Sequence, residues 1–240
     1  MARILTVKLL ALSGPILSFA DFATADGIGI DKVYHPYVQL LEQEIEFRTL
    51  YLDDHGKSAH GYQRHKLGFG SAITDSLFGE IYLTVEDLHG ESLEPESYEL
   101  ELKWQLTEQG EFSNDWGLLF ELEKEHDNPI WEASTTLIAL HEWARWIATG
   151  NLSLIYEWGD AIDDEWETAF AGQLRYRWRQ GMEPGIELYQ SQETQGIGPV
   201  LTGLIRTGQG KKLNWELGVI FGTGKETADT NLKFNLEYEF

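Results

Sequence analysis

Five of the seven histidines lie in three short stretches of the chain that are also rich in carboxylates. Imidazole and carboxylate groups together suit a borderline divalent cation such as zinc or copper. Their spacing matches no compact metal motif, so only the fold could bring them to one place. Two interpretations stay open, a metal-binding rim and a set of solvated loop residues. The rim would use His55, His60, His89, His126 and Asp87, with His65, Asp53, Asp54, Glu86, Glu125 and Asp127 nearby.

The same groups could support hydrolysis, since a carboxylate and a histidine together can activate water by general-base catalysis. The candidates for such a site are Asp53, Asp54, Asp87, His55 and His89. A serine-dependent arrangement would instead need His141 close to Ser134 or Ser153. No family-specific catalytic motif accompanies these residues, and the chain has no cysteine for thiol chemistry. We therefore favour a protein that is not an enzyme and predict no cofactor, with a surface hydrolase as the alternative.

The elements that would position these groups have a period of two. From Tyr98 to Leu106 apolar and polar side chains alternate without a break, and residues 231–240 do the same. A helix would scatter the glutamates of these segments around its surface, whereas a strand places them all on one face. The alternation therefore predicts strands with one apolar and one polar face.

Twelve such runs, separated by turn residues, follow one another along the chain. Most have ten or more residues, and a tilted strand that crosses a bilayer needs about 9–11. An even number of strands is usual for single-chain bacterial barrels. We predict an all-β fold, a transmembrane antiparallel up-and-down β-barrel of twelve strands over residues 37–240, with a periplasmic β-sandwich or lipocalin-like carrier as the rival. The runs are 37–52, 62–73, 78–87, 97–107, 115–125, 131–141, 146–157, 165–178, 184–191, 198–207, 212–222 and 230–240.

The nine tryptophans lie near the ends of the predicted strands, where a barrel meets the lipid headgroups. The expected lower girdle contains Trp104, Trp116, Trp143, Trp146, Trp178 and Trp215, and the opposite girdle contains Trp131, Trp158 and Trp166.

The first 25 residues have the features of a secretory signal peptide. Arg3 and Lys8 supply a positive start, a short apolar core follows, and residues 23–25 form an A-x-A cleavage site. A buried N-terminal helix is less favoured, because Gly14 and Pro15 would interrupt it. We predict cleavage after Ala25, a short periplasmic segment over residues 26–36, and export to the bacterial outer membrane.

The end of the chain resembles the insertion signal of Gram-negative outer-membrane β-barrel proteins, an alternating aromatic and apolar strand that closes on Phe240. The stretches WQLTEQGEF, WGLLFELEKE and WELGVIFG resemble an uncharacterised group of proteobacterial barrels. This resemblance implies two partners, the outer-membrane lipid and the barrel-assembly machinery, the latter through the last strand. It implies no substrate, and the sequence does not indicate an oligomeric state.

If the apolar faces meet lipid, the polar faces line the lumen. Pairing of the first and last strands brings three N-terminal glutamates beside two C-terminal ones. The charges either pair and fill the interior, or leave a wet negative lumen that favours cations. We predict a passive pore leaning towards cations or small solutes, or a structural envelope component. The formal charge of −22 excludes nucleic acid as a partner. The predicted lining is Glu42, Glu44, Glu46, Arg48, Arg64, Lys66, Glu80, Glu99, Glu101, Lys103, Glu121, Glu123, Glu132, Arg175, Arg177, Glu187, Arg206, Glu216, Lys233, Glu237 and Glu239.

Overall fold

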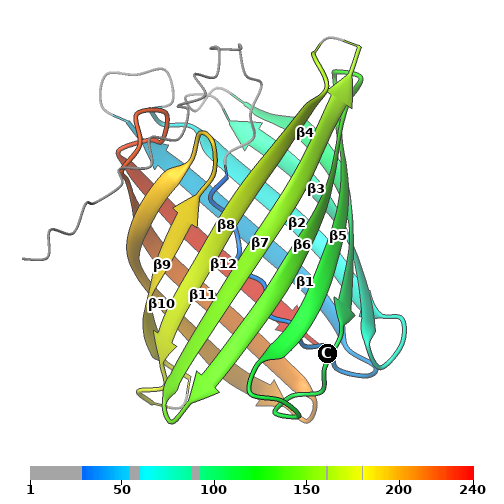
Figure 1. Ribbon diagram of the computed structural model, residues 1–240, viewed down its shortest axis with the longest axis vertical. Helices are drawn as coiled ribbons and strands as arrows, with labels where there is room; N and C mark the ends of the chain where they lie inside the picture. Colours follow the sequence, from blue (N-terminus) through cyan, green and yellow to red (C-terminus); the bar gives the residue numbers. More distant parts are fainter. Residues whose placement is uncertain (1–28, 55–59, 88–91, 161, 180) are drawn as a thin grey trace, which may run out of the picture.

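The computed structural model describes residues 29–54, 60–87, 92–160, 162–179 and 181–240. Within them twelve antiparallel strands follow one another, and the sheet closes where β1 pairs with β12 (Figure 1). The predicted twelve-stranded, up-and-down barrel is confirmed. The strands are β1 (Gln43–Asp53), β2 (Gln63–Ala72), β3 (Leu77–Asp87), β4 (Leu93–Gln105), β5 (Asp115–Glu125), β6 (Ile130–Trp143), β7 (Trp146–Gly159), β8 (Glu165–Tyr176), β9 (Glu183–Gln190), β10 (Gln195–Gly208), β11 (Lys211–Gly222) and β12 (Thr230–Glu239). No helix in these residues is long and apolar enough to cross a membrane.

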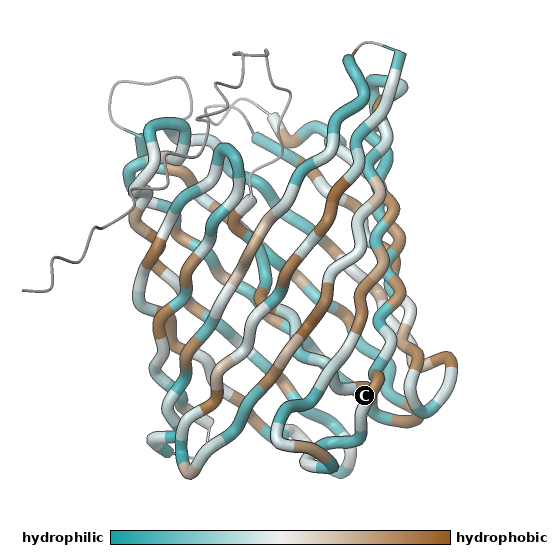
Figure 2. The backbone as a smooth tube through the Cα atoms, in the orientation of Figure 1, coloured by the Kyte–Doolittle hydropathy of each residue, from teal (hydrophilic) through white to brown (hydrophobic). Residues whose placement is uncertain are grey.

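The barrel has an apolar exterior and a polar interior because the side chains of each strand alternate. On β4, Leu100 is 54% exposed, whereas Glu101 beside it is 1% exposed. Figure 2 shows the same change of hydropathy from residue to residue along the strands. Exposed leucine, isoleucine and phenylalanine side chains on most of the strands give the exterior the character that hydrocarbon requires.

Aromatic side chains lie at both ends of the strands. Near the end where β6 begins, Trp131 and Trp158 stack with their ring centroids 6.4 Å apart. At the opposite end Trp146 packs on Tyr176 at 4.9 Å, and Trp143 is 43% exposed. These positions agree with two interfacial girdles.

The first strand is shorter than predicted, because residues 37–42 do not belong to the sheet. Leu41 has a φ of 67°, a left-handed conformation that breaks an extended strand. Before it, the Tyr37 hydroxyl donates a hydrogen bond to Asp115 and the Val38 N–H donates one to the Gln105 side chain. These residues therefore contact the inner wall instead of extending β1.

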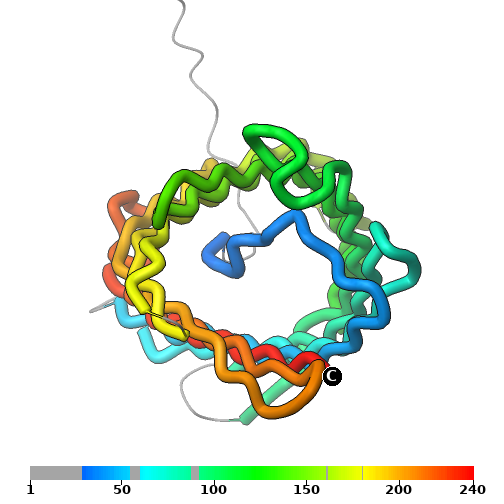
Figure 3. Tube along the Cα trace, turned by 90° about the horizontal axis from the view of Figure 1, so that it is seen from below, coloured from blue at the N-terminus to red at the C-terminus, as the bar shows by residue number. Residues whose placement is uncertain are grey.

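Residues 29–39, which we call the luminal segment, run inside the barrel. Seen from below, the blue chain that precedes β1 crosses the ring of strands (Figure 3). It begins beside Thr194, near the upper end in Figure 1, and reaches the lower end where β1 starts. Residues 29–36 were expected in the periplasm, and the structure corrects this, since their hydrogen bonds are to side chains of the barrel interior. The expected signal peptide and residues 26–28 lie outside the described residues.

Candidate functional site

The luminal segment is held in the barrel by hydrogen bonds to several different strands. Its Tyr34 exchanges two backbone hydrogen bonds with the side chain of Asn151 on β7, of 2.7 and 3.0 Å. The Tyr34 hydroxyl donates to Glu101 on β4 at 2.6 Å. Gly117 on β5 leaves room for Pro36, because a Cβ there would lie 3.0 Å from the Pro36 Cβ atom. The inner wall is therefore shaped to the segment.

Two charged residues of the segment make ion pairs with the wall. The Asp31 carboxylate lies 3.0 Å from Arg48 and 3.5 Å from Lys66. The Lys32 ammonium lies 3.0 Å from Glu46 and 2.9 Å from Glu237. Each of these pairs joins the segment to β1, β2 or β12, so the segment neutralises part of the charge at the closing seam of the barrel.

Apolar contacts add to the ion pairs. Ile30 and Val33 are almost fully buried and pack in one cluster with Leu50, Val200 and Ile220 from three strands. Tyr34 packs in a second cluster with Leu119 and Ile138. Burying a residue of this size typically contributes about 1.5–3 kcal/mol, so the segment is part of the folded barrel.

The segment divides the lumen into two cavities. The upper cavity has a volume of about 310 Å³ and the lower cavity about 510 Å³. Lys32 and Tyr34 line both of them, so the two meet at these side chains.

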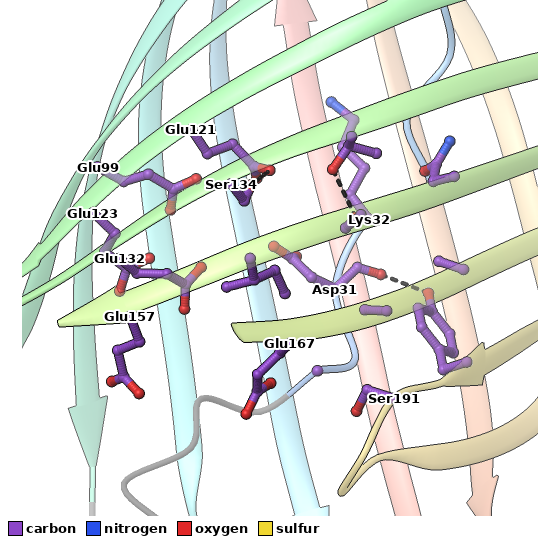
Figure 4. A pocket seen from close by; sticks show the side chains of 18 of the residues that line it. Asp31, Lys32, Glu99, Glu121, Glu123, Glu132, Ser134, Glu157, Glu167 and Ser191 are labelled. Atoms are coloured by element: carbon purple, nitrogen blue, oxygen red, sulfur yellow. Dashed lines mark hydrogen bonds between the residues drawn. The ribbon is translucent and has the colours of Figure 1, made fainter. Parts of the chain in front are cut away.

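The upper cavity contains a row of glutamates that are paired directly across neighbouring strands, which we call the acidic row. Glu99 on β4 faces Glu123 on β5, which faces Glu132 on β6, which faces Glu157 on β7. Figure 4 shows these four side chains around the cavity, with Glu121 and Glu167 nearby. Lys66 lies 2.5 Å from Glu99. No basic side chain of the described residues forms an ion pair with the other three members.

The predicted lumen residues all belong to the inward-facing set. The pairing of Glu44 with Glu239 and of Glu46 with Glu237 follows from barrel closure, as predicted from the order of the strands. Arg64, Lys66, Glu99, Glu121 and Glu123 line the upper cavity. Arg48 and Lys233 line a small void beside Asp31, and Glu101 is buried under Tyr34. The lower cavity is lined by Glu42, Glu44, Glu46, Lys103, Arg175, Arg177, Glu216, Glu237 and Glu239.

The outer histidines do not form a described metal centre. His55 and His89, which both the metal-binding rim and the Asp/His hydrolase would use, lie outside the described residues. His60 lies 2.9 Å from Asp53, and His126 contacts Tyr98 and Asp127. Asp87 ends β3 on the same side of the barrel. Within the described part of the chain, the groups of three or more residues that could hold a metal ion contain only glutamates.

The arrangement of His141 with Ser134 or Ser153 is wrong. Ser134 points into the lumen and is 7% exposed, and Ser153 shares a hydrogen bond with Thr136 on the same inner face. His141 is an odd number of residues from Ser134 on β6, so its ring lies on the outer face, where it stacks with Trp143. The wall of the barrel separates the two groups.

Sequence reasoning missed the residues that divide the lumen. Asp31, Lys32 and Tyr34 lie in a stretch that has neither the period of a strand nor that of a helix. The signal that could have indicated a buried segment is the run of residues 30–34, which mixes apolar and charged side chains just before the first strand.

The closed sheet, the apolar exterior and the polar lumen define the class of transmembrane β-barrels. No family model matches the chain, and no curated protein matches its sequence. Solved structures do match it. The KdgM porin in complex with disordered oligogalacturonate has a TM-score of 0.55 at 12% identity, over 82% of this chain and 99% of that one.

Two further structures have the same fold. An outer membrane channel from Pseudomonas putida F1 has a TM-score of 0.56 at 13% identity, over 88% of this chain and 98% of that one. The NanC porin has a TM-score of 0.52 at 8% identity, over 82% and 98%. The chain therefore has the fold of the outer-membrane porins and channels.

Proposed function

We propose that the protein is a passive outer-membrane pore for small solutes that prefers cations, and that the luminal segment forms its constriction. The observation that carries this proposal is the lining of the upper cavity, where ten carboxylates face three basic side chains. All three basic residues, Lys32, Arg64 and Lys66, already pair with carboxylates. Acidic linings of this kind concentrate cations and repel anions.

The acidic row is the local cause of the proposed preference for cations. Like charges placed directly opposite one another across strands repel, and a low-dielectric wall strengthens the repulsion. A mobile cation between Glu123, Glu132 and Glu157 relieves it. The same lining disfavours acidic sugars, so the oligogalacturonate bound by the KdgM porin is a poor model for the solute of this chain.

Planar-bilayer recording tests the proposal. The folded protein is inserted into a neutral lipid bilayer with a tenfold KCl gradient, and the reversal potential is measured. We expect a small conductance, because the luminal segment divides the lumen, and a reversal potential with the sign of potassium selectivity. Absence of conductance, or a reversal potential with the sign of chloride selectivity, contradicts the proposal.

We further propose how the chain reaches the membrane. Residues 1–25 direct export and are removed after Ala25, and the outer-membrane lipid then surrounds the apolar exterior. The barrel-assembly machinery binds the strand that ends at Phe240. In support, Phe240 follows β12 at the closing seam, stacks on Tyr238 at 5.7 Å and exchanges backbone hydrogen bonds with Gln43. Mass measurement of the purified protein tests the cleavage site.

A further inference from the structure

Three carboxylates meet inside the seam that closes the barrel. Glu44 and Glu46 are two residues apart on β1 and point to the same side, and Glu237 on β12 is directly opposite Glu46. One carboxylate oxygen from each of them lies within 4.8 Å of the other two. We call these three residues the seam triad.

The spacing suits a hard divalent cation. Calcium binds oxygen ligands at about 2.3–2.6 Å, so two oxygens on one ion are separated by no more than about 5 Å. The three oxygens of the seam triad meet this limit without movement of the backbone. The donor set is oxygen only, which favours calcium or magnesium over zinc or copper.

Unused oxygens distinguish this triad from an ordinary acidic cluster. Glu44 is 3% exposed, lines the lower cavity and has no hydrogen-bond or ion-pair partner among the described residues. Glu46 is 1% exposed, and its Oε1 atom is buried without a partner. Burying such groups without compensation is expensive, so a cation bound to these oxygens would stabilise the seam.

The lysine of the luminal segment contacts two of the three carboxylates. The Lys32 ammonium contacts the Oε2 atoms of Glu46 and Glu237, and Arg48 contacts the Oε2 atom of Glu46 at 2.9 Å. Lys32 thus provides one positive charge where a divalent ion would provide two. Its ammonium is held on the chain and competes for two of the same carboxylates, those of Glu46 and Glu237.

A second group of three glutamates is less suited to an ion. Oxygens of Glu99, Glu101 and Glu121 also lie within 4.8 Å of one another. Lys66 is 2.5 Å from Glu99, and the Tyr34 hydroxyl donates to Glu101 at 2.6 Å. Glu99 and Glu101 thus each have a close donor, although Glu101 Oε2 is also buried without a partner. In the seam triad the whole Glu44 carboxylate has no donor among the described residues.

We propose that the seam triad is a divalent-cation site, with calcium the preferred ion, and that Lys32 competes with the ion for it. The site links the ion to the position of the luminal segment, because displacement of Lys32 removes its ion pairs with Glu46 on β1 and Glu237 on β12. The proposal does not depend on conductance, since a barrel that passes no ions could still bind calcium here.

Isothermal titration calorimetry tests the site. Calcium chloride is titrated into the folded protein in chelator-treated detergent micelles, with magnesium chloride and sodium chloride as separate titrants. We expect one saturable calcium site with a dissociation constant on the order of 10⁻⁴ to 10⁻³ M. No saturation is expected with sodium.

Three variants make the test specific. Glu44→Gln should weaken calcium binding by at least about tenfold, because it removes one ligand charge, and Lys32→Gln should strengthen it, because it removes the competitor. Glu142→Gln is the matched control, since Glu142 lines the same cavity and pairs with Arg177. Its affinity should equal that of the unaltered protein.

Two kinds of result overturn the proposal. Absence of saturable heat in the unaltered protein, or equal affinities in Glu44→Gln and the unaltered protein, removes the site. An unchanged affinity in Lys32→Gln removes the competition. Each variant is first checked for a shift in gel mobility on boiling, which shows that its barrel is folded.

Discussion

The carboxylates of the lumen face one another because side chains alternate along each strand and every second one points inward. Glu99, Glu123, Glu132 and Glu157 each occupy an inward position, and the register places them side by side. In water such residues would separate, but the hydrogen bonds of the sheet hold them opposite one another. We therefore expect these four mutually repelling carboxylates to attract a cation that passes through the lumen.

Neutralising the acidic row should reduce selectivity. In Glu132→Gln/Glu157→Gln the upper cavity loses two carboxyl groups that have no ion pair, so the reversal potential should move towards zero while the barrel stays folded. Bilayer recording in a KCl gradient measures this, with Glu111→Gln in an exposed loop as the control. An unchanged reversal potential in the double variant would show that other residues determine the ion selectivity.

Glu42, at the lower end of the lumen just before β1, should make stability depend on pH. Burial and the neighbouring Glu239 carboxylate raise the pKa of Glu42 to about 7. An unfolded glutamate titrates near about 4.3, so between these values the folded barrel holds a proton that the unfolded chain has lost. The contribution of Glu42 is therefore complete below about pH 4 and is lost as the pH rises through about 7.

Urea unfolding in phospholipid vesicles at pH 5 and pH 8 measures the effect. The free energy of unfolding should fall less between the two values in Glu42→Gln than in the unaltered protein. Identical changes in the two proteins would mean that Glu42 does not hold the proton.

At the scale of elements, the luminal segment divides the lumen of the barrel into two cavities. It has no regular secondary structure, so its backbone groups take their partners from wall side chains such as Asn151, Gln105 and Thr194. Buried backbone groups must find hydrogen bonds. This requirement explains why polar side chains of the wall point at a chain that is not part of the sheet.

Removing the segment should enlarge the pore. Deletion of residues 29–39 joins the upper and lower cavities, and single-channel conductance in a planar bilayer should rise. The finer variant Asn151→Ala removes two hydrogen bonds to Tyr34, at a cost of about 1–3 kcal/mol, and should give brief openings to the larger conductance. Equal conductance in the deletion variant and the unaltered protein would show that the segment does not form the constriction.

At the scale of the whole molecule, closure between β1 and β12 completes the hydrogen bonding of the sheet. In hydrocarbon an open sheet edge is excluded, because its N–H and C=O groups would have no partners. Phe240 lies at this seam and its backbone pairs with Gln43. The end of the chain therefore contributes to closure as well as to the proposed recognition by the assembly machinery.

Deleting Phe240 should reduce the amount of folded barrel in the outer membrane, because both the proposed recognition and two seam hydrogen bonds are lost. Membrane fractionation followed by gel mobility with and without boiling measures it. Phe112→Ala, in an exposed loop between β4 and β5, is the control for loss of an exposed aromatic ring. Normal assembly of the truncated chain would argue against a role for the last residue.

The twelve strands followed from the sequence because lipid outside and polar lumen inside impose a period of two, a local property that each strand displays by itself. Tyr98 to Leu106 predicts its own two faces with no knowledge of its neighbours. The alternation along each strand also predicted which glutamates face the lumen. Closure of an even-stranded barrel places Glu46 beside Glu237. Parity would likewise have excluded the pairing of His141 with Ser134, which lie seven residues apart on one strand.

Only the tertiary structure decided what fills the lumen. Residues 29–39 have no periodic pattern, because they contact several different strands and not one repeating surface. The ion pairs of Lys32 join positions far apart in the chain, Glu46 and Glu237, and the register alone does not predict a third partner. The division into two cavities depends on such long-range contacts, which no local pattern records.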